Sequence, residues 1–316
     1  MKPDPTILRS ARVQPTALNL SGSICALATP FRAADDALDL EAFDRLVDYQ
    51  LSGGTRALVV AGSTGEGAAL DNDEFPALVE RAVRVVAGRV PVLAGTGMQS
   101  TRKTIAQTRL AAAAGADLAL VVTPAYVRPT QEGLYRHFSE VAEAGRIPVM
   151  LYNVPSRTAC DLLPGTVARL ASHPMIIGIK EARAETERMR ELLELRSDGF
   201  RIYSGDDPTC ARAMLAGASG VVSVAANVAP AAMQNLAERA LSGDSTAVSL
   251  ADQALVPLYE LLGAEPNPIP VKWMLQRLGL GGECLRLPLL PLSPAYHAQA
   301  EHVLAMLGLT PIARSA

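Results

Sequence analysis

The sequence predicts an α/β fold, a (β/α)8 barrel of the TIM type followed by a C-terminal helical extension. Short apolar segments alternate with amphipathic helical segments between residues 23 and 223, and glycine or polar residues follow the apolar segments. Beyond residue 229 only helical periodicity remains. An open doubly wound sheet is the alternative, but it usually has fewer units and an early nucleotide loop. The glycines at residues 62–66 lack the GxGxxG spacing of such a loop.

The predicted strands are short runs rich in Val, Ile, Leu and Ala. Such continuous apolar runs are typical of parallel strands that are buried on both faces. In chain order they are residues 23–28, 57–60, 91–94, 118–122, 148–152, 176–180, 201–204 and 220–223.

The predicted helices have apolar side chains at helical spacing, and several end at glycine. In chain order they are residues 40–51, 73–87, 100–114, 131–144, 164–171, 231–241, 245–262, 270–278 and 294–307. We therefore expect a flexible N-terminal extension at residues 1–19, a barrel at 20–243 and a C-terminal helical region at 244–316.

Composition excludes several classes of function. A net charge of −3 without a basic block argues against a nucleic-acid partner. No apolar run reaches the roughly 18 residues that span a membrane, and residues 1–19 lack the apolar segment of a signal peptide. The four cysteines are isolated, and the histidines lack the spacing of metal ligands. We expect a reduced, cytoplasmic protein without a metal.

Lys180 is the strongest candidate for a catalytic residue. It ends the apolar segment 176–180, so its amine is expected at the C-terminal end of a buried strand, where barrels carry their active sites. Only four of the 29 basic residues are lysines. A lysine can lose its proton and attack a carbonyl, whereas an arginine stays protonated. The alternative is a strand-terminal lysine whose amine reaches water.

Other candidates follow neighbouring strands. Ser63 and Thr64 offer hydroxyls and backbone amides for a small carboxylate. Tyr152 ends a strand, where a phenol can exchange protons, and Arg157 can bind a carboxylate through two parallel hydrogen bonds. Taken singly, these residues also fit an ordinary turn, a core tyrosine and a surface arginine. Their expected convergence with Lys180 on one face favours a site.

Three segments resemble the dihydrodipicolinate synthase / N-acetylneuraminate lyase family of pyruvate-dependent class I aldolases. They are GSTGE at 62–66, YNVPSRT at 152–158 and GIKEA at 178–182. Further similar segments are residues 128–135, 204–207, 267–273 and 285–288. The resemblance extends from about residue 20 to residue 309 and is greatest to the synthase branch.

The resemblance implies a role for each candidate. Lys180 corresponds to the lysine that forms a Schiff base with pyruvate, and Tyr152 to the proton donor and acceptor beside it. Ser63 stands at the relay hydroxyl, where the synthases usually have threonine. Tyr126 corresponds to a relay tyrosine that reaches in from a neighbouring subunit.

The resemblance also implies the binding residues. Thr64 corresponds to the ligand of the pyruvate carboxylate, with the backbone of Val222 close to the same substrate. Arg157 corresponds to the arginine that binds aspartate semialdehyde, and Gly205 lines the site with its backbone. The implied partners are these two substrates and further copies of the chain, as a homotetramer of tight dimers. The implied chemistry needs no metal or organic cofactor.

Departures from the family pattern leave the second substrate open. Ala125, Val127 and Ala159 differ from the usual residues near the pocket. Lys103 places a cation where lysine-inhibited members bind lysine, so we expect weak or absent inhibition by lysine. The alternatives are an aldolase or dehydratase of the same family that acts on a sugar acid, and a protein that only binds an oxo acid. Arg157 within Ser-Arg-Thr favours the synthase, and Lys180 with both tyrosines disfavours mere binding.

Overall fold

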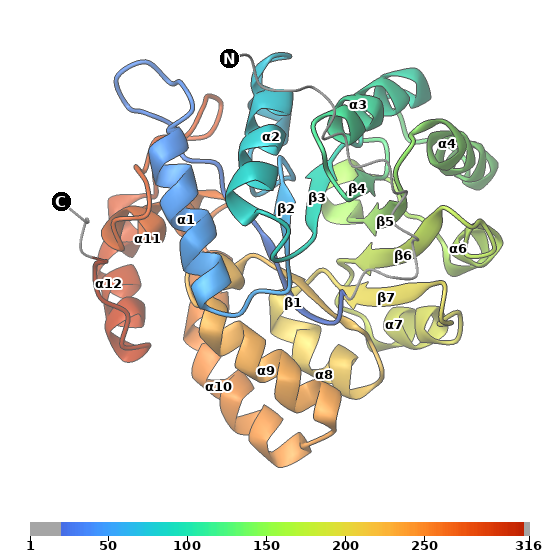
Figure 1. Cartoon of the computed structure of the whole chain (residues 1–316). Coiled ribbons are helices and arrows are strands. Elements are labelled where there is room, and N and C mark those ends of the chain that lie inside the picture. The colour runs from blue at the N-terminus through green and yellow to red at the C-terminus, as the bar shows by residue number, and fades with distance from the viewer. Residues whose placement is uncertain (1–19, 313–316) are drawn as a thin grey trace.

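Eight parallel strands close a barrel at the centre of the molecule, in the order β1 to β8, with β8 paired to β1 (Figure 1). The structure is a computed structural model that describes residues 20–312. The strands are β1 (Gly22–Ala26), β2 (Ala57–Val60), β3 (Val92–Gly95), β4 (Leu118–Val122), β5 (Val149–Asn153), β6 (Ile176–Glu181), β7 (Arg201–Ser204) and β8 (Gly220–Ser223). The predicted fold class is confirmed. The expected flexible extension at 1–19 lies outside the described residues.

Helices surround the barrel and continue beyond it (Figure 1). The helices are α1 (Leu40–Ser52), α2 (Glu74–Val86), α3 (Thr101–Ala113), α4 (Gln131–Ala144), α5 (Pro155–Thr158), α6 (Pro164–Leu170), α7 (Thr186–Leu193), α8 (Cys210–Leu215), α9 (Pro230–Ser242), α10 (Ser245–Leu262), α11 (Ile269–Arg277) and α12 (His297–Met306). Short 3-10 turns are η2 (Gly67–Ala69), η3 (Asp207–Thr209), η4 (Ala225–Asn227) and η5 (Pro294–Tyr296).

Sequence periodicity missed α5, α7 and α8. The first is a single turn, and α8 has only six residues. In α7, charged residues dominate, and only Met189 and Leu192 are buried. A short helix with two apolar contacts has too weak a pattern to be recognised without its tertiary context.

Several helices begin at residues whose side chains cap the exposed amides. Asp39 accepts a hydrogen bond from the amide of Ala42 at the start of α1, and Asp244 does the same for Ala247 at the start of α10. Such caps satisfy donors that lack a partner within the helix, and each contributes about 1 kcal/mol. They fix where the loop after β1 ends and where the short connection from α9 to α10 ends.

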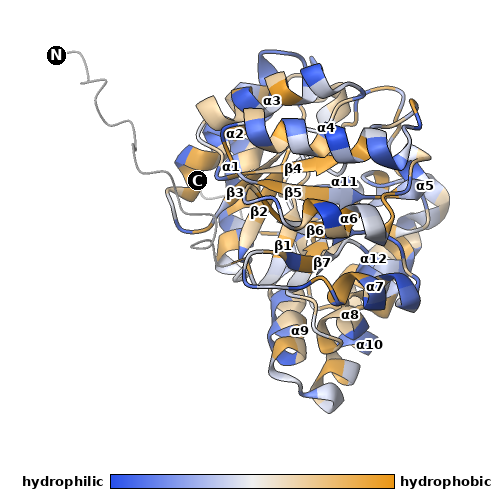
Figure 2. Cartoon of the chain, turned by 90° about the vertical axis from the view of Figure 1, so that its right-hand side faces the viewer, coloured by the Kyte–Doolittle hydropathy of each residue, from blue (hydrophilic) through white to orange (hydrophobic). Residues whose placement is uncertain are grey.

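The strands are buried on both faces, which explains their continuous apolar character. Figure 2 shows hydrophobic strands inside a layer of helices whose outer faces are largely hydrophilic. Along β5, Val149 and Leu151 belong to the cluster packed against the helices, whereas Met150 and Tyr152 belong to the cluster inside the barrel. The interior cluster comprises Leu20, Ile24, Ala26, Ala57, Val59, Leu93, Leu118, Leu120, Met150, Tyr152, Val154, Ile177, Tyr203 and Val222.

A register shift in β6 sets the direction of its last residues. Val149 of β5 pairs with Ile176, but Met150 pairs with Gly178, so one extra residue is accommodated between them. A Cβ on Gly178 would lie 2.3 Å from the carbonyl oxygen of Arg201, so glycine is required at this close approach. Beyond the shift, Tyr152 pairs with Lys180, and both lie on the inward face.

Candidate active site

Lys180 and Tyr152 form the centre of the candidate site. Lys180 lies at the C-terminal end of β6 and is 5% exposed, while Tyr152 on β5 is 7% exposed. The Lys180 Nζ lies 4.3 Å from the centroid of the Tyr152 ring. Among the described residues Lys180 has no ion pair, although lysines are almost never buried without one. A buried amine beside a phenol is suited to attack on a carbonyl with local proton exchange.

Gly205 packs directly against the lysine side chain. A Cβ at this position would lie 2.7 Å from Lys180 Cε and 2.8 Å from Cγ. The amide of Gly205 donates to the carbonyl of Glu181 at 2.7 Å, which ties the end of β7 to β6. Val222 on β8 is fully buried in the interior cluster. The structure therefore brings Lys180, Tyr152 and Gly205 together at one end of the barrel.

Asp207 adds a buried carboxylate to the same region. Its Oδ2 accepts from the amides of Val224 at 3.0 Å and Ala225 at 2.8 Å, which fixes the backbone after β8. Burial raises the pKa of Asp207, while hydrogen bonds from Ser223 and these amides and the charge of Lys180 act in the opposite direction. The sequence marked this residue only as part of a similar segment.

Thr64 and Arg157 are joined by Asn267, which precedes α11. The Asn267 Nδ2 donates to Thr64 Oγ1 at 2.9 Å, and Arg157 donates to the Asn267 carbonyl at 3.1 Å. Because Thr64 Oγ1 accepts from Asn267, its own hydroxyl hydrogen remains available for an anion. Asn267 thus connects the two residues predicted to bind carboxylates, a link that the sequence could not reveal.

A buried ion pair anchors the loop that carries Ser63 and Thr64. Glu66 adopts a left-handed backbone conformation with φ 50°, and its carboxylate lies 2.5 Å from Lys272 Nζ on α11. Both side chains are 2% exposed, and the amide of Arg286 donates to the other carboxylate oxygen at 3.0 Å. Burial lowers the pKa of Lys272, while Glu66 opposes that shift. In the sequence, Lys272 was noted only as part of the similar segment 267–273.

Ser63 and Tyr126 are both exposed within the chain. Tyr126 follows β4, is 90% exposed and has a positive φ of 72°. Such a conformation is uncommon for a bulky residue and is often found at functional sites. The neighbouring Val127 is 52% exposed, so an apolar tip projects from the surface.

A second polar network lies directly behind the central pair. Asn153 follows Tyr152 and Glu181 follows Lys180, and both are fully buried outside the barrel wall. Burial raises the pKa of Glu181 to about 7, against hydrogen bonds from Asn153 and the amide of Arg183. Neither residue was among the site residues predicted from the sequence.

Within residues 20–312, no group of three or more His, Cys, Asp or Glu side chains is arranged to hold a metal ion. Among the helices described, none has the length and apolar character needed to cross a membrane.

Comparisons with known proteins agree with these features. A model of the Dihydrodipicolinate synthetase family matches residues 19–307. The chain is 58% identical to the 4-hydroxy-tetrahydrodipicolinate synthase of Xanthomonas axonopodis pv. citri over 91% of this chain and 95% of that protein. It is 48% identical to the enzyme of that name from Pseudomonas aeruginosa, over 92% of this chain and 99% of that protein.

Solved structures give the same result. The chloride-inhibited dihydrodipicolinate synthase from Acinetobacter baumannii, complexed with pyruvate, superposes with a TM-score of 0.90 at 41% identity. The match covers 92% of this chain and 99% of that chain. A monomeric dihydrodipicolinate synthase variant superposes with a TM-score of 0.90 at 39% identity, over 94% of this chain and 99% of that chain. The family predicted from the sequence is confirmed: the chain belongs to the dihydrodipicolinate synthetase family.

Proposed function

We propose that this chain is a 4-hydroxy-tetrahydrodipicolinate synthase, which condenses pyruvate with L-aspartate-4-semialdehyde. The observation that carries the proposal is the buried Lys180 amine, 4.3 Å from the Tyr152 ring centroid. The names of relatives at 48% and 58% identity support the same reaction. The proposed setting is the cytoplasm.

The first half of the proposed reaction activates pyruvate. The Lys180 amine adds to the C2 carbonyl, and loss of water leaves a protonated imine. The free hydroxyl hydrogen of Thr64 and the backbone near Val222 bind the pyruvate carboxylate. The imine withdraws electrons, so the methyl carbon loses a proton and the adduct becomes an enamine. The Tyr152 phenol beside the amine exchanges these protons.

The second half forms the new carbon–carbon bond. The enamine carbon attacks the aldehyde of the second substrate, whose carboxylate is bound by Arg157. The amine of the product then attacks the imine carbon, closes the ring and releases Lys180. Ser63 and Tyr126 extend the Tyr152 relay, so protons move without a free ion in the pocket. These steps require no metal or organic cofactor.

The proposed enzyme acts as a homotetramer built from tight dimers. The exposed Tyr126 supports this proposal, because a relay residue that is 90% exposed needs a covering surface to work in a dry site. A second copy of the chain would supply that surface. One matched structure is a monomeric variant, so this fold can also exist without partner subunits. Light scattering of this chain in solution would measure its oligomeric state.

Borohydride trapping with pyruvate, followed by peptide mass mapping, tests the proposal. We expect a reduced adduct on Lys180, and Lys180→Arg should abolish it because a guanidinium does not attack the carbonyl. Turnover should then be measured with aspartate semialdehyde and with sugar acids. An adduct that persists in Lys180→Arg, or cleavage of sugar acids in preference to the condensation, would contradict the proposal.

A further inference from the structure

The ends of β5 and β6 carry two adjacent residue pairs that point in opposite directions. Tyr152 pairs with Lys180, and the next residues, Asn153 and Glu181, pair with each other. Because side chains alternate along strands, the first pair faces the barrel interior and the second faces the surrounding helices. Asn153 and Glu181 are each 0% exposed, so the second pair is fully buried.

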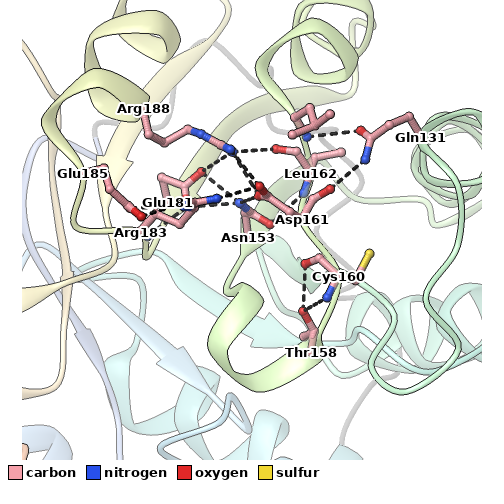
Figure 3. A network of polar contacts seen from close by, with 11 residues as sticks. Gln131, Asn153, Thr158, Cys160, Asp161, Leu162, Glu181, Arg183, Glu185 and Arg188 are labelled. Atoms are coloured by element: carbon pink, nitrogen blue, oxygen red, sulfur yellow. Dashed lines mark hydrogen bonds and ion pairs between the residues drawn. The ribbon is translucent and has the colours of Figure 1, made fainter.

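The Asn153 amide connects the two strands. Its Nδ2 donates to both carboxylate oxygens of Glu181, at 3.1 Å and 3.0 Å, and to Asp161 Oδ1 at 2.8 Å. Its Oδ1 accepts from the amide of Leu162 at 2.9 Å. These contacts use both the donor and acceptor groups of the amide, which fixes its orientation (Figure 3).

Two arginines close the network from outside. Arg188, on α7, binds Asp161 through both terminal nitrogens, at 3.0 Å and 2.8 Å, and lies 3.5 Å from Glu181 Oε2. The backbone amide of Arg183 donates to Glu181 Oε1 at 2.9 Å, and its guanidinium lies 2.8 Å from Asp161. Figure 3 shows these groups converging on Glu181 and Asp161. Glu185 also pairs with Arg183, at 2.6 Å, so three carboxyl groups contact the two guanidinium groups.

The network lies next to the two central residues of the candidate site. Asn153 and Glu181 are bonded through the chain to Tyr152 and Lys180, so a shift between the outer pair moves the inner pair. We infer that Asn153 and Glu181 are positioning residues, which hold the ends of β5 and β6 together and thereby set the placement of the Tyr152 phenol against the Lys180 amine. This inference rests on the proposed function.

The two halves of the reaction should respond differently to loss of this support. Addition of the Lys180 amine to pyruvate depends chiefly on the lysine and the bound carboxylate. Proton exchange with Tyr152 depends on the mutual placement of both groups, and a misplacement of about 1 Å can cost about 100-fold in rate. The positioning pair should therefore affect kcat more than adduct formation or KM.

Three carboxylate-to-amide variants make a matched set. Glu181→Gln keeps the side-chain shape but changes the acceptor of Asn153. Asp161→Asn changes the outer end of the network and leaves the Asn153–Glu181 contact in place. Glu185→Gln is the control, because Glu185 is 55% exposed and pairs only with Arg183 among the described ion pairs. The readouts are kcat, KM for pyruvate, the borohydride-trapped fraction and the crystal-structure distance from Lys180 Nζ to the Tyr152 ring.

We expect Glu181→Gln to lower kcat by roughly 10- to 100-fold with the adduct still formed at saturating pyruvate. Asp161→Asn should lower kcat by about 3-fold, and Glu185→Gln should stay within about 2-fold of the parent. A folded Glu181→Gln enzyme with unchanged kcat, or with an unchanged distance between the two side chains, would overturn the inference. If that variant does not fold, an unchanged kcat in Asp161→Asn overturns it.

Failure of the proposed function would look different. In that case the parent enzyme forms no adduct with pyruvate, whatever the variants do. The crystal-structure distance then decides the positioning inference: a displaced Lys180 in Glu181→Gln supports it, and an unmoved Lys180 contradicts it.

Discussion

At the scale of single residues, the contact with Gly205 restricts the position of the Lys180 side chain in the candidate site. A Cβ at Gly205 would lie 2.7 Å from Lys180 Cε and 3.2 Å from the Cβ of Ala182. Such separations are too short for carbon atoms in contact. The lysine side chain is flexible, so it can move aside where a backbone cannot.

We therefore expect Gly205→Ala to fold but to displace Lys180 and slow adduct formation with pyruvate. Single-turnover borohydride trapping measures this rate, and circular dichroism verifies the fold. Gly165→Ala in α6 is the matched control, because nothing lies within 4 Å of its Cβ and alanine favours helix by up to about 1 kcal/mol. Equal trapping rates in the two variants would show that Gly205 does not set the position of the lysine.

The sequence could predict the two central residues because their environment is local. Apolar residues on the N-terminal side of Lys180 and Tyr152 were sufficient to place both at strand ends. Asn153 and Glu181 are their immediate neighbours, but their role depends on Arg188 and Asp161, which lie elsewhere in the chain. Periodicity assigns a face to a residue and does not identify the partner that it meets there.

At the scale of elements, α11 fixes the loop after β2 through a buried ion pair. Removing one partner of such a pair leaves an uncompensated charge, which typically costs 3–5 kcal/mol, whereas replacing both partners often costs far less. Lys272→Met should therefore lower stability by about 4 kcal/mol, and the double variant with Glu66→Gln should recover part of the loss.

Thermal or denaturant unfolding of both single variants and the double variant measures this coupling. The Thr64 loop should also lose its support in Lys272→Met, so KM for pyruvate should rise. Equal destabilisation by the single and double variants would contradict the importance of charge balance at this contact.

His137 connects α3 to α4 and makes their contact sensitive to pH. Its Nδ1 lies 3.0 Å from Thr101 Oγ1, and burial lowers the pKa of His137 to about 4 from its ordinary value of 6.5. Because the folded value is the lower one, its contribution to stability is complete above about pH 6.5 and is lost as the pH falls towards 4.

Between these two pH values, protonation of His137 lowers the free energy of unfolding by about 3 kcal/mol in all. We expect His137→Gln to remove this share of the acid destabilisation. Melting temperatures between about pH 4 and pH 7 measure it, with the exposed His302→Gln as control. Carboxylates that titrate in the same pH range affect both variants equally, so the difference between their melting temperatures reports on His137 alone. Parallel pH curves for the two variants would assign the acid sensitivity to other groups.

At the scale of the whole molecule, the barrel could be predicted because most strands are buried on both faces and read as continuous apolar runs, such as β2 and β4. The contacts of α11 with the loop after β2 could not be predicted, because more than 200 residues separate Glu66 from Lys272. The boundaries at residues 19 and 243 remain predictions.

The exposed Tyr126 leads to a prediction about assembly. If it acts in the site of a neighbouring copy, mixing Lys180→Arg and Tyr126→Phe subunits should restore activity. Each hybrid pair then contains one site with an intact Lys180 and an intact Tyr126. Each parent variant alone should be impaired, the second by about 100-fold or more if the phenol transfers protons.

Subunit exchange before the assay, with light scattering to measure the oligomeric state, provides the test. Activity that equals the sum of the separate variants would place Tyr126 in its own subunit's site or outside any site.

The anchoring of the Thr64 loop from the far end of the chain also has a consequence for biosynthesis. A ribosome completes β8 well before it adds Asn267, Lys272 and Arg286, which hold that loop. At that stage all eight strands, Lys180 among them, have been synthesised, while the residues that hold the Thr64 loop have not. The assembled pocket therefore depends on residues that are synthesised only after the last strand of the barrel.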